Sequence, residues 1–61
     1  MGSREIVKIL ESNGWRLDRV KGSHHIFAHP VHGNSVTVPH PKKDLGIGLV
    51  RAILKQAHIK D

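Results

Sequence analysis

What constrains the fold most is how little chain there is from which to build a hydrophobic core. The chain has 61 residues, and a domain of that size buries only about 60% of the surface that its unfolded form exposes. Cysteine is absent, so neither disulfides nor thiolate metal sites can supplement the core. We therefore expect one domain, residues 1–61, with a shallow, open active site suited to a polymer lying across its surface.

Two further absences bear on where such a chain works. No apolar run approaches the roughly 20 residues that span a bilayer, and no signal-peptide core follows the start. The lack of cysteine also fits a reducing cytosol. These observations predict a soluble cytoplasmic protein that does not enter a membrane.

The charge balance points to a polyanionic partner. Ten Lys and Arg oppose five Asp and Glu, which gives a net charge of +5, and there are six histidines besides. A pI near 10.3 in so small a domain is the electrostatic pattern expected of a nucleic-acid binder. A merely soluble basic protein, or one that binds an acidic protein, remains open on composition alone.

The first segment of the chain has helical periodicity. Ser3 is a good N-cap, and Glu5 would favour the positive end of the helix dipole. Gly14 suits the left-handed position that follows a helix. A helix is therefore predicted from Ser3 to Ser12.

Three short segments with strand character follow. Trp15–Val20 is predicted as the first strand, although Val20 breaks its simple alternation, and Lys21-Gly22-Ser23 as a tight turn. His24–His29 is predicted as the second strand, stopped by Pro30, and Ser35–Val38 as the third.

The spacing becomes helical again from Leu45 onward, with Asp44 as a plausible N-cap or first-turn acid. One face of this second helix is expected to carry Leu49, Val50, Ile53, Leu54 and Ala57. The order is α-β-β-β-α. Because two helices can cover only one face of three antiparallel strands, the predicted fold is an α+β two-layer sandwich.

Several common sites have no counterpart in the sequence. There is no Gly-rich phosphate loop, and no helix carries two histidines and a glutamate. The crowding of His24, His25, His29, His32 and His40 could suggest a metal, but the spacing matches no zinc pattern, so no metal or other cofactor is expected. For His25, His29 and His40 we expect hydrogen bonds to the backbone, and for His32 and His58 plain surface positions.

His24 differs because it opens a strand directly after the Gly22 turn. A histidine there is held by the sheet, remains open to solvent and can exchange protons with a substrate. Arg16, Arg19 and Lys21 are expected on the neighbouring strand, where cations could stabilise a charged phosphorane. A single histidine suffices in principle, since RNA supplies its own nucleophile, the 2′-hydroxyl. The residues alone leave both a catalytic and a structural role for His24 open.

Lys42 and Lys43 form a second basic element, just before the second helix. Fixed positive charge beside the free N–H groups of a helix start is a natural seat for phosphate. A solvated basic loop is an equally good interpretation, because Asp44 offsets part of the charge.

The sequence resembles the HicA family of toxins. The similarity is carried by Asn13-Gly14-Trp15, Gly22-Ser23-His24-His25, Val36-Thr37-Val38-Pro39-His40-Pro41, Lys43-Asp44-Leu45 and Ile53-Leu54-Lys55-Gln56-Ala57. It covers essentially the whole chain in order. One departure is Gly46, where many relatives carry proline, and it should loosen the helix start.

The resemblance implies a double-stranded-RNA-binding-domain-like fold and a type II toxin that acts as an mRNA interferase, a metal-independent endoribonuclease. It implies that His24 is the catalytic histidine and that a HicB-type antitoxin covers the site. RNA would be bound by Arg19, Lys21, Gly22, Ser23, Lys42 and Lys43. A non-catalytic RNA-binding module is the alternative, and a protein dedicated to partner binding is a third possibility.

Overall fold

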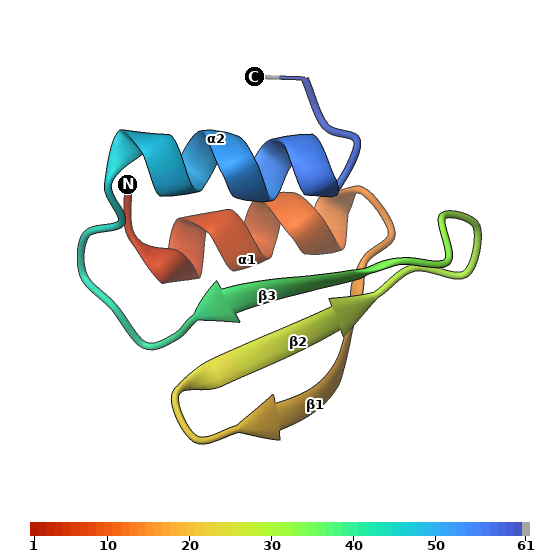
Figure 1. The fold of residues 1–61 in the computed structure, drawn as a ribbon, viewed down its shortest axis with the longest axis horizontal. Helices are drawn as coiled ribbons and strands as arrows, with labels where there is room; N and C mark the ends of the chain where they lie inside the picture. The colour runs from red at the N-terminus through yellow and green to blue at the C-terminus, as the bar shows by residue number, and fades with distance from the viewer. Residues whose placement is uncertain (61) are drawn as a thin grey trace.

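The computed structural model describes residues 1–60 and has the predicted element order. Helix α1 (Ser3–Ser12) is followed by strands β1 (Arg16–Lys21), β2 (His24–Ala28) and β3 (Ser35–Pro39), and then by helix α2 (Ile47–Gln56). The strands form one antiparallel sheet in the order β1-β2-β3, and both helices lie on one side of it (Figure 1). The predicted α+β sandwich, with two helices on one face of a three-stranded sheet, is confirmed.

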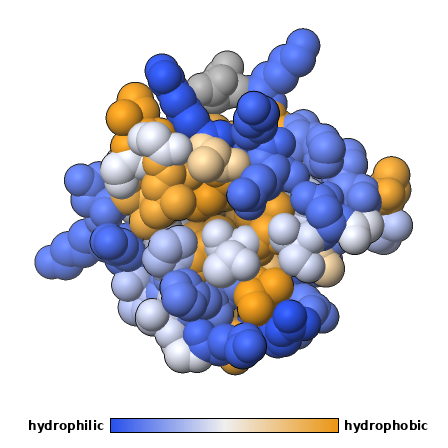
Figure 2. Space-filling view, viewed as in Figure 1, coloured by the Kyte–Doolittle hydropathy of each residue, from blue (hydrophilic) through white to orange (hydrophobic). Residues whose placement is uncertain are grey.

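The core lies between the helices and the inner part of the sheet. Trp15, in the short link between α1 and β1, is fully buried, and its indole N–H donates to the Ala57 carbonyl at 3.2 Å. The core residues are Ile6, Leu10, Trp15, Phe27, Val36, Val38, Leu45, Val50, Ile53, Leu54 and Ala57. In space-filling view a band of apolar surface crosses the middle of the molecule, with hydrophilic side chains around it (Figure 2).

Strand β1 lies outside this core because the helices pack over β3, at the other edge of the sheet. All six of its residues are exposed. The strand contains a β-bulge: Leu17 pairs with Phe27 but Arg19 pairs with Ile26, which leaves Asp18 as an extra residue. The bulge explains the irregular alternation in the sequence, because it returns Val20 to the helix-facing side that Leu17 occupies.

Helix α1 has the predicted bounds but not the predicted cap. Its N-cap is Gly2, so the assignment of Ser3 as N-cap is wrong. Ser3 is instead the first helical residue, 1% exposed, and its hydroxyl bonds to Lys42. Gly2 is needed here because a Cβ would lie 2.7 Å from the Lys43 carbonyl oxygen. Local sequence favours serine as a cap, and only the return of residues 40–43 to this helix start overrides that preference.

Helix α2 begins later than expected, at Ile47 with Gly46 as N-cap. Asp44 is therefore not its cap; this exposed carboxylate lies 3.4 Å from the N-terminal ammonium. Leu45 is buried before the helix starts. Of the predicted core face only Leu49 is wrong, since it is 40% exposed while the other four residues are buried.

Candidate nucleic-acid interface

The sheet face opposite the helices carries His24 together with cations. Cross-strand partners point to the same face, and His24 pairs with Lys21 while Arg19 pairs with Ile26, two residues further along β2. His24 is exposed at the first position of β2. The sequence predicted these cations on the strand next to His24, and the register places Lys21 and Arg19 on the same face as His24. The Arg19 guanidinium is 3.2 Å from the Asp18 carboxylate in an exposed pair, which is worth little in water.

The turn before His24 is open. Gly22 has a φ of +58°, and a Cβ built there would have no heavy atom within 4 Å. The Ser23 carbonyl accepts a hydrogen bond of 2.8 Å from the His40 N–H, which ties the turn to the end of β3. The turn is thus held by the bond to His40 and adds little bulk beside His24.

Lys42 and Lys43 lie beside the start of α1, not of α2 as the sequence suggested. The Ser3 N–H donates to the Lys42 carbonyl at 2.9 Å, and the Lys42 N–H donates to Ser3 Oγ at 2.8 Å. The prediction failed because Lys42 is 39 positions from Ser3 and no local pattern reports that pairing.

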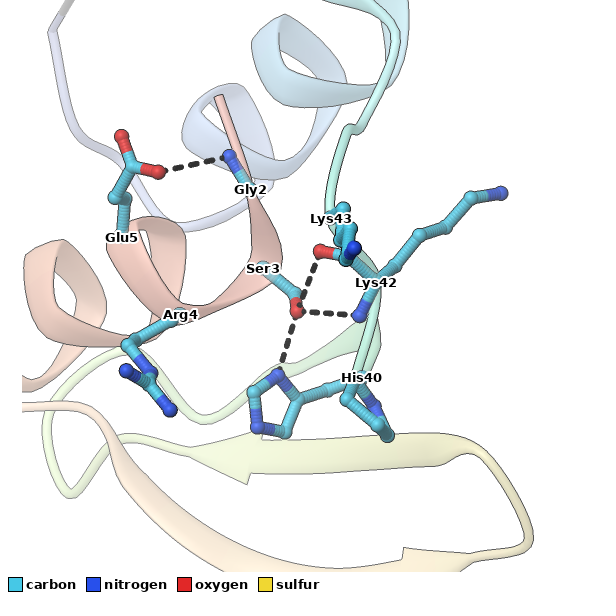
Figure 3. Close-up of a pocket in the computed structure, with 8 residues that line it drawn as sticks. Gly2, Ser3, Arg4, Glu5, His40, Lys42 and Lys43 are labelled. Atoms are coloured by element: carbon cyan, nitrogen blue, oxygen red, sulfur yellow. Dashed lines mark hydrogen bonds between the residues drawn. The ribbon is translucent and has the colours of Figure 1, made fainter.

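A shallow pocket of about 480 Å³ lies at this helix start (Figure 3). It is lined by Gly2, Ser3, Arg4, Glu5, His40, Pro41, Lys42 and Lys43. Arg4 and His40 are members that sequence reasoning missed as functional candidates. The Glu5 carboxylate, its one acidic group, accepts a hydrogen bond of 3.1 Å from the Gly2 N–H.

Ser3 orients the His40 ring in this pocket. Ser3 Oγ donates to the Lys42 carbonyl at 3.0 Å and lies 2.6 Å from His40 Nδ1. The Lys42 N–H already donates to this hydroxyl, so the hydrogen of the contact with His40 comes either from the hydroxyl or from Nδ1–H, according to the tautomer of the ring.

The neighbouring histidines depart from the expected backbone bonding. The His25 and His40 rings meet edge to face, with centroids 4.7 Å apart, and His25 Nδ1 is buried with no hydrogen-bond partner among residues 1–60. His29 does behave as predicted, since Nε2 lies 3.0 Å from the Asn13 carbonyl oxygen and Nδ1 accepts from the Val31 N–H. The prediction is wrong for the other two. His25 Nδ1 has no partner within residues 1–60, and the His40 ring bonds to the Ser3 side chain instead of the backbone.

A second group of rings lies at the opposite end of β2. The His32 ring stacks between Trp15 and His58, with centroid distances of 5.8 and 4.2 Å. Desolvation lowers the pKa of His32 below its ordinary value, and the nearby His58 and His29 lower it further. His32 and His58 are exposed, as expected, but they are not isolated, because their rings stack on each other.

Two negative findings apply to residues 1–60. Within them, no group of three or more His, Asp or Glu side chains is placed to hold a metal ion. Neither helix in this range has the length and apolar character needed to cross a membrane.

Fold and site together define a class: a small basic α+β domain with an exposed histidine beside cations at one end of its sheet. The sequence profile described as "HicA toxin of bacterial toxin-antitoxin" matches residues 3–59. The chain belongs to this HicA toxin family, as the motifs in the sequence indicated.

A solved structure supports the same assignment. The chain is 38% identical to one in a structure described as "HicA3 and HicB3 toxin-antitoxin complex", with a TM-score of 0.80. The alignment covers 98% of this chain and 97% of that one. The comparison with curated protein sequences found no match.

Proposed function

We propose that the protein is the toxin of a type II toxin–antitoxin pair and acts as a metal-independent endoribonuclease on mRNA in the cytoplasm. The observation that carries the proposal is the exposed imidazole of His24, directly across the strand pair from Lys21 at an open turn. Membership of the HicA toxin family and the net charge of +5 support it.

The chemistry follows from what RNA brings to the site. Attack of the 2′-hydroxyl on the adjacent phosphorus requires a proton to leave that hydroxyl and another to reach the departing 5′-oxygen. His24 supplies one of these transfers, which is the work that general acid–base catalysis asks of a histidine. Lys21 and Arg19, on the same face, stabilise the charge that develops on the phosphorane oxygens.

The remaining cations bind the polymer. Lys42 and Lys43 are exposed at the pocket beside α1, and phosphate contacts of this kind add affinity without reading sequence. The Gly22-Ser23 turn lets the backbone of the RNA come close to His24.

A HicB-type antitoxin is the proposed protein partner. The related chain was solved in a complex described as HicA3 with HicB3. An antitoxin that covers the cationic face around His24 would compete with RNA for the same positive charge, because both ligands must neutralise it.

The decisive experiment compares RNA cleavage by the wild type and by His24→Ala. Loss of the proton-transfer group should lower the cleavage rate by about 10²–10⁴-fold, with unchanged circular dichroism. His58→Asn is the matched control: it removes a histidine outside the site at a residue with φ of +59°, which asparagine tolerates.

The products and the metal requirement complete the test. A 2′,3′-cyclic phosphate with undiminished cleavage in EDTA is expected. A folded, fully active His24→Ala would refute the role of His24, and a 3′-hydroxyl with a 5′-phosphate would refute attack by the 2′-hydroxyl. Wild-type protein that retards RNA on a gel but leaves it intact would favour the non-catalytic binding module.

A further inference from the structure

His40 is contacted by the side-chain hydroxyl of a buried serine. Ser3 is 1% exposed, and its hydroxyl contacts His40 Nδ1 at 2.6 Å while exchanging hydrogen bonds with both the N–H and the carbonyl of Lys42. A serine hydroxyl could satisfy itself at a helix start without a histidine. When the hydroxyl hydrogen is directed to the Lys42 carbonyl, Nδ1–H is the donor to Ser3 Oγ, and Nε2 is the ring nitrogen left without a bond to Ser3.

Orientation of this kind matches what a proton-transfer histidine requires. The imidazole must present a single nitrogen to the substrate, and a partner on the other nitrogen sets both the tautomer and the ring angle. Burial of Ser3 keeps water from competing for Nδ1. His40 itself is half-buried and lines the pocket that Arg4, Lys42 and Lys43 surround (Figure 3).

His40 also lies at the same end of the sheet as His24. Pro39 is the cross-strand partner of His24, and His40 follows it directly, with its N–H bonded to the Ser23 carbonyl. His24 thus opens β2 directly after the Gly22-Ser23 turn, and His40 follows β3 beside the same turn. The His24 side chain lies on the sheet face opposite the helices, whereas the His40 ring meets His25 on the helix side. For both histidines to act on one phosphate, the RNA must pass over this end of the sheet, where a Cβ at Gly22 would have no heavy atom within 4 Å.

We propose that His40 is a second catalytic residue of this ribonuclease, with Nε2 as the general base. The inference rests on the proposed function, which leaves one of the two proton transfers without a donor or acceptor. His40 Nε2 takes the proton of the 2′-hydroxyl as the 2′-oxygen bonds to phosphorus. The bond from phosphorus to the 5′-oxygen breaks, and protonated His24 delivers its proton to that oxygen. The products are a 2′,3′-cyclic phosphate and a 5′-hydroxyl, with neutral His24 and protonated His40.

His40→Asn isolates the chemistry from the architecture. The asparagine amide can donate to Ser3 Oγ from the position that Nδ1 occupies, but nothing replaces Nε2. The variant should therefore fold as the wild type does by circular dichroism, yet cleave RNA about 10²–10⁴-fold more slowly, the usual effect of losing a general acid or base. His58→Asn, the same substitution outside the site, should keep the wild-type rate.

A substrate with a modified leaving group separates the two roles. When sulfur replaces the scissile 5′-oxygen of an RNA oligonucleotide, the thiolate leaves without a proton, because its pKa is far below that of an alcohol. This substrate should restore the rate of His24→Ala to within about tenfold of the wild type, since the missing acid is worth 10²-fold or more. It should leave His40→Asn as slow as before, because the 2′-hydroxyl still needs a base.

Each result decides between named possibilities. Failure of the wild type to cleave RNA refutes the ribonuclease function and this inference with it. Wild-type cleavage together with a fully active His40→Asn overturns only the role of His40. Rescue of His40→Asn by the sulfur substrate overturns the assignment of His40 as the base. If the sulfur substrate rescues neither variant, the assignment of His24 as the acid and His40 as the base is overturned.

Discussion

Trp15→Phe tests whether the buried indole holds the two helices together through its hydrogen bond. The substitution keeps an aromatic ring but removes the N–H that donates to the Ala57 carbonyl at 3.2 Å. Loss of one partner from a buried hydrogen bond costs about 1–3 kcal/mol. The smaller ring gives up further burial, about 1–2 kcal/mol if it equals one or two methylene groups.

The sum, about 2–5 kcal/mol, is large for this chain. At about 0.05–0.15 kcal/mol per residue, a 61-residue domain has only some 3–9 kcal/mol in total. The midpoint of thermal unfolding should fall by at least about 8 °C, since each kcal/mol shifts it by about 4–8 °C in domains of this size.

The assay is urea unfolding followed by far-ultraviolet circular dichroism, because Trp15 is the only tryptophan and its fluorescence is lost in the variant. Leu17→Ala is the control, as this side chain is 50% exposed on the outer strand and should change stability by less than about 1 kcal/mol. If the free energy of unfolding of Trp15→Phe lies within about 0.5 kcal/mol of the wild-type value, the indole hydrogen bond does not stabilise the contact between the ends of the two helices.

Two further outcomes are expected. Gly14→Ala should destabilise more than Gly33→Ala: both glycines have positive φ, but only at Gly14 would a Cβ lie 2.7 Å from His29 Nε2, and equal unfolding midpoints would contradict this. His32 should make stability fall with acid, because its folded-state pKa is lowered by desolvation and then by His58 and His29. The contribution of His32 to stability is complete above its pKa in the unfolded chain, about 6.5. It is lost as the pH falls through its lower pKa in the folded protein. His32→Phe keeps a stacked ring but carries no charge. In thermal melts from pH 7.5 to 5 its unfolding midpoint should therefore fall less than that of the wild type. An equal fall in both proteins would show that His32 is not the source of the acid sensitivity.

The elements were predictable from sequence because each has its own local pattern. The bounds of α1 followed from periodicity and from Gly14, whose positive φ ends the helix as expected. The placement of Arg19 on the strand next to His24 followed from the tight turn predicted between the two strands. Such patterns extend over only a few residues, because the conformational preferences of the backbone act over that range.

What the sequence could not supply were contacts between distant segments. The Ser3 hydroxyl meets His40 and Lys42, which lie 37 and 39 positions later. Nothing near Ser3 distinguishes this use from capping, and the cap preference pointed the wrong way. The β-bulge at Asp18 did leave a trace, as the broken alternation at Val20.

Helix α1 is tied at both ends to residues made much later in synthesis. Ser3 bonds to Lys42 at one end, and Trp15, just beyond the other, bonds to Ala57. Closing such long loops costs entropy that local helix formation cannot repay. A growing or truncated chain that lacks α2 therefore has no partner for Trp15 and cannot complete its core. The fold is secured only when nearly the whole chain is present, so premature termination should yield peptides without the organised surface around His24.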